Sequence, residues 1–257
     1  MNWVKARDYE EMSTLAARRM FELISAKVSQ GEPVNLGMAT GNTMIGTYRM
    51  LAELLNGTKI DLSRVSTFNL DEYVDDKGEN VSPEHPLSYR KYMYEKLAAL
   101  LAPRLGFKRE RMHFPDATNP GNYDAQIENS GGLEFQLLGI GFNGHIAFNE
   151  PQSEDEISAE DFAALPSRVI SLDALTIQTN SRLTAGGNSD LVPRKAVTMG
   201  MRSILKAKEI LLLACFPEQV APLTRIRTSR ITPELQASFL LEHPSAHVIY
   251  TGDNIKL

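Results

Sequence analysis

The sequence predicts an α/β fold with a mostly parallel, Rossmann-like sheet that helices cover on both faces. Helical and strand patterns alternate along the chain, as they do where parallel strands are joined by helices. The strand candidates are short and mostly apolar, and their alternation with helices implies parallel strands covered on both faces. With 257 residues, 42% apolar and 23% charged, the chain has the composition of an ordinary globular protein. We therefore expect a single domain over residues 1–257.

The expected elements follow in chain order. Apolar residues at helical spacing predict an amphipathic helix over 9–29. Apolar runs bounded by turn residues predict strands at 34–38, 65–70, 133–140, 169–172, 196–199, 210–215 and 247–250. Helical patterns recur at 43–55, 88–101, 200–207, 217–228 and 233–242. The polar stretches 74–86, 103–122 and 151–166 predict surface loops, and we expect a lid over the ligand around 151–185.

Composition excludes several classes of partner. The net charge is −5 and there is no long basic run, so we expect no nucleic acid partner, because phosphate backbones require clustered Lys and Arg. No apolar stretch approaches membrane-spanning length, so we expect no membrane partner. Cys215 is the only cysteine, which excludes an internal disulfide and a multi-cysteine metal site. These features predict a cytoplasmic protein, monomeric or homo-oligomeric, that acts on a small molecule.

Ligands of open α/β sheets bind at the carboxyl ends of the strands, and the first such end carries a phosphate-binding pattern. The segment Leu36–Thr43 leaves a strand and opens a helix. Free backbone N–H groups there, with the hydroxyls of Thr40 and Thr43 and the flexible Gly41-Asn42 pair, form a cradle for phosphate. The segment lacks the Lys of a Walker loop and the spacing of a dinucleotide fingerprint, which favours a monophosphate. The alternative is an ordinary capped helix start.

The second strand end carries two carboxylates, Asp71 and Glu72. A carboxyl group that is partly buried in a cleft has a raised pKa, which suits it to take a proton from carbon. Asp71 is therefore the candidate base. The alternative is that both acids are solvated loop residues or helix caps. Farther along, Ser88 is expected to cap the helix predicted at 88–101.

The third strand end is a glycine-rich turn that presents a histidine. Glycines at 139, 141 and 144 allow a sharp turn and close approach to a ligand. His145 can bind or release a proton near neutral pH. Glu150 lies five residues on and meets the imidazole if the chain folds back, so the two would form an oriented acid/base pair. The alternative is a strand and loop with a surface histidine.

Several blocks of sequence together resemble the glucosamine-6-phosphate deaminase family. They cover nearly the whole chain in order and are far more specific as a set than any single motif. The blocks are Leu36–Thr43, Phe68–Tyr73, His85-Pro86 with Ser88-Tyr89, Gly144–Pro151, Asn180–Arg182, Val192-Pro193 and Ala196–Gly200.

The resemblance implies a cofactor-free and metal-free reaction that converts glucosamine 6-phosphate and water to fructose 6-phosphate and ammonia. Asp71 matches the base that moves a proton from carbon 2 to carbon 1 of the opened sugar. His145 matches the residue that opens the pyranose ring, and Glu150 matches the carboxylate that orients and charges it. Gly41, Asn42 and Thr43 match the phosphate loop. Arg182 matches the guanidinium that pairs with the phosphate.

Two positions depart from the family pattern. Asn143 stands where the family usually has an Asp that is hydrogen-bonded to the histidine. Its carbonyl could still fix the ring, and we include Asn143 in the catalytic group, but it cannot stabilise an imidazolium by charge. Gln219 stands where a phosphate-binding Lys is usual. Losing one charge-assisted contact costs roughly 1.5 to 3 kcal/mol if nothing replaces it.

Other functions remain open at this point. The departures are compatible with a different hexosamine phosphate, such as galactosamine 6-phosphate. 6-Phosphogluconolactonase has a similar glycine-histidine turn, but its turn usually continues with Thr, Ala and Ser, whereas this one continues with Ile146-Ala147-Phe148. A non-catalytic sugar-phosphate sensor would be expected to lose Asp71 or His145. The residues therefore favour a hexosamine-6-phosphate deaminase, and they do not select the sugar epimer.

Overall fold

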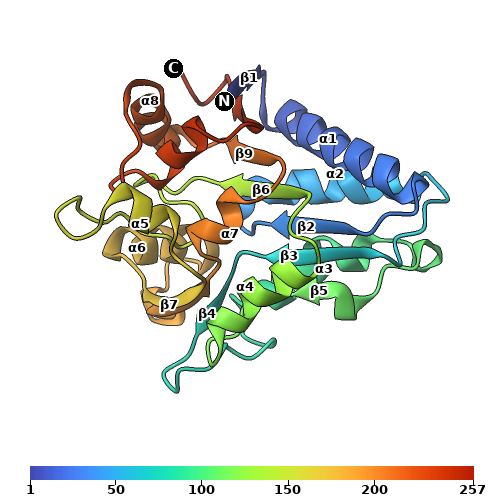
Figure 1. Ribbon diagram of the computed structural model, residues 1–257, viewed down its shortest axis with the longest axis horizontal. Coiled ribbons are helices and arrows are strands. Elements are labelled where there is room, and N and C mark those ends of the chain that lie inside the picture. The colour runs from blue at the N-terminus through green and yellow to red at the C-terminus, as the bar shows by residue number, and fades with distance from the viewer.

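Two sheets organise the computed structural model, which describes residues 1–257 (Figure 1). The larger sheet has seven strands in the order β1-β10-β9-β6-β2-β3-β5, and all its neighbouring strands are parallel. The smaller sheet has three antiparallel strands in the order β4-β8-β7. The predicted α/β class with a mostly parallel sheet is confirmed. The separate antiparallel sheet was not predicted.

The strands are β1 (Asn2–Ala6), β2 (Val34–Met38), β3 (Val65–Asn69), β4 (Asp71–Val74), β5 (Met112–His113), β6 (Phe135–Gly139), β7 (Arg168–Ser171), β8 (Lys195–Thr198), β9 (Ile210–Ala214) and β10 (Ala246–Thr251). The α-helices are α1 (Tyr9–Ser29), α2 (Ile45–Asn56), α3 (Tyr89–Lys96), α4 (Pro120–Asn129), α5 (Ala159–Ala163), α6 (Ala174–Thr184), α7 (Met201–Leu205) and α8 (Val220–Thr228). Short 3-10 helices are η1 (Asn42–Met44), η2 (Ala98–Leu100), η3 (Pro103–Leu105), η4 (Arg109–Arg111), η5 (Ser189–Leu191), η6 (Pro217–Gln219) and η7 (Gln236–Leu241).

Helices cover both faces of the seven-stranded sheet, as predicted. Right-handed crossovers place α1, α2 and α3 on one face, behind the strands in Figure 1, and α4, α7 and α8 on the other. Strands β2, β3 and β9 are buried along their whole length, since both faces of the sheet are covered. Of these three strands β9 is a continuous apolar run, as expected for burial on both faces, whereas β2 and β3 also bury polar residues, namely Asn35, Ser66, Thr67 and Asn69.

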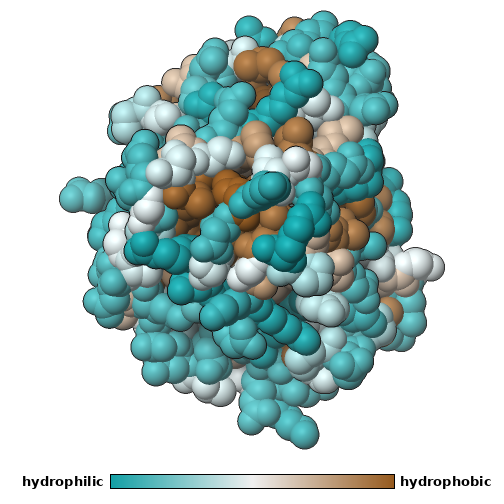
Figure 2. Space-filling model, turned by 90° about the vertical axis from the view of Figure 1, so that its right-hand side faces the viewer, coloured by the Kyte–Doolittle hydropathy of each residue, from teal (hydrophilic) through white to brown (hydrophobic).

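The chain reverses its direction of progress through the sheet between the neighbouring strands β2 and β6. From β2 it continues to β3 on one side, whereas from β6 it continues to β9 on the other. The loops that follow β2 and β6 therefore diverge and leave a crevice at the carboxyl ends of these strands. This edge is the left end of the sheet in Figure 1, beside α6 and β7. The opposite edge, where the strands begin, is the face in Figure 2, where apolar residues gather near the centre of a mostly hydrophilic surface.

Several local predictions were wrong. The loops predicted at 103–122 and 151–166 contain the start of α4 and all of α5, and the helix predicted at 233–242 is the 3-10 helix η7. Helix α6 was not predicted, because its Thr, Gln, Asn and Ser residues leave too few apolar residues at helical spacing. Its start is defined by the Asp173 side chain, which accepts a hydrogen bond from the Leu175 N–H. No helix is both long and apolar enough to cross a bilayer.

Candidate active site

A cavity of about 160 Å³ lies at the carboxyl ends of the strands that flank the crevice. Its walls are the loops that follow β2, β3, β6 and β9, together with helix α6. Of the site residues predicted from the sequence, those that line it are Thr40, Gly41, Asn42, Thr43, Asp71, Asn143 and His145. Glu150 lies directly behind His145, and Arg182 lies outside the lining. The cavity therefore brings three separate strand ends together, as predicted.

Asp71 is the first residue of β4 and is only 6% exposed. Its Oδ1 accepts a hydrogen bond of 3.2 Å from the backbone N–H of Phe148. The same N–H lies 3.0 Å from the hydroxyl of Thr198, the residue paired with Asp71 across β4 and β8. Burial raises the pKa of Asp71 to about 7, against the lowering effects of Thr198, Phe148 and His145. A carboxyl group with this pKa can both accept and return a proton near neutral pH.

The N–H that reaches Asp71 is aimed by an unusual backbone conformation. Ala147 has φ of 53°, and it is the one residue other than glycine with a positive φ. A left-handed conformation is unfavourable for a residue with a Cβ and persists where surrounding structure enforces it, often at functional sites. Here the adjoining N–H of Phe148 is bound by Asp71 and Thr198. The strain therefore serves to position the candidate base.

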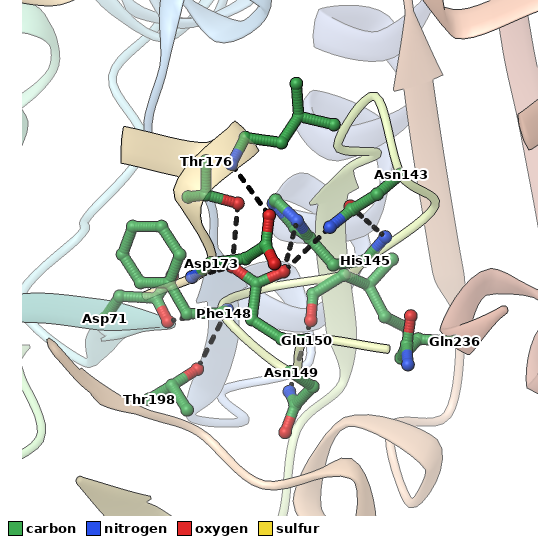
Figure 3. Close-up of polar contacts among 12 residues, drawn as sticks. Asp71, Asn143, His145, Phe148, Asn149, Glu150, Asp173, Thr176, Thr198 and Gln236 are labelled. Atoms are coloured by element: carbon green, nitrogen blue, oxygen red, sulfur yellow. Dashed lines mark hydrogen bonds and ion pairs between the residues drawn. The ribbon is translucent and has the colours of Figure 1, made fainter. Parts of the chain in front are cut away.

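His145, which lines the cavity, forms a close pair with Glu150 (Figure 3). Nδ1 of His145 lies 3.2 Å from Oε2 of Glu150, and the two side chains are 15% and 14% exposed. The atoms are at ion-pair distance, but Nδ1 makes no hydrogen bond of good geometry, so the attraction is chiefly one of charge when the ring is protonated. Glu150 also accepts a hydrogen bond of 2.7 Å from the Thr176 hydroxyl.

Glu150 is charged at neutral pH. Burial alone would raise its pKa, but the contact and charge of His145, with hydrogen bonds from Thr176 and Asn143, outweigh burial and lower the pKa to about 2. Helix α6, through Thr176, thus helps to hold a charged carboxylate next to the imidazole. The structure thus places Glu150 against His145, and their role as an acid/base pair stays a prediction.

Asn143 does not contact the imidazole ring in the way that its sequence position suggested. Its Oδ1 accepts a hydrogen bond of 3.2 Å from the backbone N–H of His145, and its Nδ2 donates one of 2.9 Å to Oε2 of Glu150. A short amide side chain two residues before its target reaches the backbone readily, as in an Asx turn. Asn143 therefore positions both members of the His145–Glu150 pair, and the expectation that its carbonyl would fix the ring is corrected.

The ring of His145 packs directly on Gly141, so we expect Gly141→Ala to impair activity. A methyl group at position 141 would overlap three atoms of the ring, and a displacement of about 1 Å in a catalytic group can lower activity by about 100-fold. We therefore expect kcat/KM to fall about 100-fold with little change in thermal stability. Gly121→Ala is the control, because a methyl group there meets no atom within 4 Å. Equal activities of the two variants would contradict this role for Gly141.

The loop after β2 presents unpaired backbone donors to the cavity. Gly41 has φ of 105°, and the N–H groups of Gly41, Asn42 and Thr43 make no hydrogen bond within the chain. Tyrosine hydroxyls hold the loop from behind: Tyr92 donates to the carbonyl of Gly41 at 2.7 Å, and Tyr9 donates to the carbonyl of Asn42 at 3.0 Å. Free N–H groups ahead of α2 form an arrangement that binds anions.

Arg182 is not placed as a ready phosphate ligand. Its side chain is 60% exposed, and its Nη2 lies 2.8 Å from Oε1 of Glu218. No lysine or arginine is among the residues that line the cavity. The expected pairing of Arg182 with phosphate would require Arg182 to exchange its partner.

Gln219, the residue at the expected Lys position, holds the backbone. Its Oε1 accepts hydrogen bonds from the N–H groups of Cys215 and Phe216, and its Nε2 donates to the carbonyl of Ile140. The residue is 2% exposed, and its three hydrogen bonds join the ends of β6 and β9. They leave one N–H of Nε2 without a partner in the chain, so Gln219 offers a ligand at most one uncharged donor in place of an ammonium group.

Glu72 caps a helix rather than sharing in the acid cluster. It is fully buried and accepts hydrogen bonds from the N–H groups of Tyr89 and Arg90 and from the Ser88 hydroxyl at the start of α3. Ser88 caps α3, as predicted. Thr176 and Thr198 were missed as site residues, because nothing in their local sequence indicates the distant carboxylates that they meet.

This chain resembles known proteins over nearly its whole length. Residues 7–251 match the family described as glucosamine-6-phosphate isomerases and 6-phosphogluconolactonase. A glucosamine-6-phosphate deaminase of Thermoanaerobacter pseudethanolicus is 36% identical over 94% of this chain and 89% of the relative. The solved structure of a monomeric glucosamine-6-phosphate deaminase superposes with a TM-score of 0.85 and 31% identity, over 99% of this chain and 98% of the other. A 6-phosphogluconolactonase from Shewanella baltica superposes with a TM-score of 0.73 and 14% identity over 98% of both chains, which shows a shared fold.

Proposed function

This chain belongs to the family of glucosamine-6-phosphate isomerases and 6-phosphogluconolactonases, and we propose that it converts glucosamine 6-phosphate and water to fructose 6-phosphate and ammonia. The observation that carries the proposal is the cavity that joins a carboxyl group with a pKa of about 7 to a close His–Glu pair and a loop with unpaired N–H groups. A sugar phosphate needs these groups at its two ends, one for binding and one for proton transfer.

Binding begins at the phosphate end of the sugar. The phosphate would accept hydrogen bonds from the unpaired N–H groups of residues 41–43 and from the hydroxyls of Thr40 and Thr43. Arg182 would form an ion pair with it from α6. The sugar then extends along the cavity toward Asp71 and His145. Loops from different strands hold the two ends of the substrate, which fixes the reacting carbons near the base.

Ring opening is assigned to His145. Its imidazolium donates a proton to the ring oxygen of the sugar as the bond from that oxygen to carbon 1 breaks. The imidazole then takes a proton from the hydroxyl on carbon 1. Glu150, charged at neutral pH because its pKa is about 2, stabilises the imidazolium and holds its orientation. Asn143 braces both residues.

Isomerisation is assigned to Asp71. Its carboxylate takes the proton from carbon 2 of the open-chain sugar, the aldehyde oxygen on carbon 1 gains a proton as the amino group loses one, and Asp71 returns its proton to carbon 1. The aldehyde has then become a hydroxyl group, and the double bond lies between carbon 2 and nitrogen. Water adds to this imine carbon, and ammonia leaves, which completes the ketose phosphate. With a pKa of about 7, Asp71 is matched to both halves of the proton transfer.

The lid expected around 151–185 is proposed to move only in its second half. Helix α5 is anchored, because Phe162 is fully buried and stacks on Phe239 at 5.6 Å. Helix α6 forms a wall of the cavity and is held by single side-chain contacts, such as the hydrogen bond of 2.8 Å from Asn180 to Tyr73. Motion of α6 would admit substrate while the catalytic loop stays in place.

A panel of substrates tests the function and separates it from its rivals. We expect ammonia release from at least one of glucosamine, galactosamine and mannosamine 6-phosphates, with glucosamine 6-phosphate preferred. A preference for galactosamine 6-phosphate would keep the chemistry and change the epimer. Hydrolysis of 6-phosphogluconolactone without ammonia release would support the hydrolase. Binding of all three sugars without turnover would support a sensor and overturn the proposal.

We expect Asn143→Asp to shift the pH dependence of kcat/KM toward higher pH. The added carboxylate would lie close to the His145–Glu150 pair and favour the imidazolium by its charge, and an opposite charge within about 4 to 6 Å typically shifts a titration by about one pH unit or more. Initial rates of ammonia release from pH 5 to 9 measure the effect. Asn143→Ser, which adds no charge, is the control. An unchanged profile in Asn143→Asp would contradict the proposed role of this pair.

A further inference from the structure

An ion pair bridges two elements at the rim of the cavity. Arg182 on α6 and Glu218 on η6 meet at 2.8 Å, and their side chains are 60% and 41% exposed. Each is flanked by residues that line the cavity: Asn180 and Leu183 on one side, and Phe216 and Gln219 on the other. The guanidinium lies 5.9 Å from the centre of the Phe142 ring, and Phe142 also lines the cavity. The pair therefore stands beside the space that a ligand would occupy.

Arg182 has no substitute as a cation for this cavity. The lining contains neither lysine nor arginine, and the side chain of Gln219 is uncharged and bonded to the backbone. Glu218 is charged at neutral pH, since its hydrogen bond with Arg182 lowers its pKa. A phosphate bound in the loop 40–43 and the carboxylate of Glu218 would thus compete for the guanidinium of Arg182.

We propose that Glu218 competes with the substrate phosphate for Arg182. A phosphorylated sugar displaces Glu218 from Arg182 on binding, and Glu218 pairs with Arg182 again when the phosphorylated product leaves. The inference rests on the proposed function, because it takes the phosphate to bind beside Arg182. A carboxylate carries one charge and a phosphate ester approaches two, so exchange favours the ester. Glu218 nevertheless weakens the binding of the ester, because the ion pair between Arg182 and Glu218 must first be broken.

The test is Glu218→Gln, assayed with glucosamine 6-phosphate. We expect KM to fall about two- to fivefold, the range that exposed ion pairs reach, with kcat unchanged or slightly lower. The inhibition constant of inorganic phosphate should fall by a similar factor. Glu154→Gln is the matched control, because Glu154 pairs with Arg230 at 2.6 Å at the surface, outside the cavity lining. This control should alter neither constant.

A double variant separates competition from simple repulsion. In an Arg182→Gln background, Glu218→Gln should no longer improve phosphate binding. An improvement that persists there would show that Glu218 acts through its own charge, and it would overturn the competitor role, as would an unchanged KM in the single variant. If the wild type releases no ammonia from any hexosamine phosphate, the proposed function fails by itself, and calorimetry with inorganic phosphate still tests the competition between Glu218 and phosphate for Arg182.

Discussion

Asp71→Asn is expected to lower kcat for ammonia release by about a thousandfold, the middle of the range for loss of a general base. Asparagine preserves the shape of the side chain but cannot take a proton from carbon 2. KM should change little, since the proposed phosphate contacts lie in a separate loop. Steady-state rates at pH 8, where the wild-type carboxyl is mostly ionised because its pKa is about 7, measure the effect.

Thermal unfolding provides the control for Asp71→Asn. The pKa of Asp71 is raised from 3.8 to about 7 in the folded chain, so the folded state binds the proton more tightly than the unfolded state. Stability is therefore lost as pH rises from about 4 through 7, and removing the charge should leave Tm at pH 8 equal or higher. A variant that stays folded by this measurement and retains most of its activity would contradict the assignment of Asp71 as the base.

His145→Gln is expected to lower kcat/KM by about 100-fold or more. Glutamine can form hydrogen bonds, but it cannot carry a proton to the ring oxygen, and the usual contribution of a general acid is about 10²- to 10⁴-fold. Glu150 would also lose the partner that lowers its pKa. Initial rates at low substrate concentration measure kcat/KM.

His247→Gln is the matched control for His145→Gln. His247 lies on β10 and faces Arg19, not the cavity, so its loss should leave kcat/KM unchanged. A His145→Gln variant that works as well as this control would show that ring opening does not depend on His145.

The parts of the fold that could be predicted are those whose pattern is local. Short segments rich in apolar residues and bounded by turn residues predicted β2, β3 and β9, and spaced apolar residues predicted α1. Strand β4 could not be predicted. It begins at Asp71, with only Leu70 between it and the end of β3, and it exists because β8, more than 120 residues later, pairs with it. Such pairing leaves no signal in the short polar segment itself.

In the candidate site, too, residues that follow a local sequence pattern could be predicted and contacts between distant elements could not. Asp71, His145 and the loop 40–43 could be predicted, because each follows an apolar strand and the carboxyl ends of parallel strands meet at one edge. The partners of these groups could not be predicted. Thr176 reaches Glu150 from α6, and Glu218 holds Arg182 from η6, and such contacts depend on how distant elements are packed.

Ammonia and fructose 6-phosphate formed from glucosamine 6-phosphate in the same reaction give the most direct test. Wild-type protein should produce the two in equal amounts, and Asp71→Asn should produce almost none at the same protein concentration and pH. Equal rates from both proteins, or no ammonia from the wild type, would contradict a deamination in which Asp71 moves the proton.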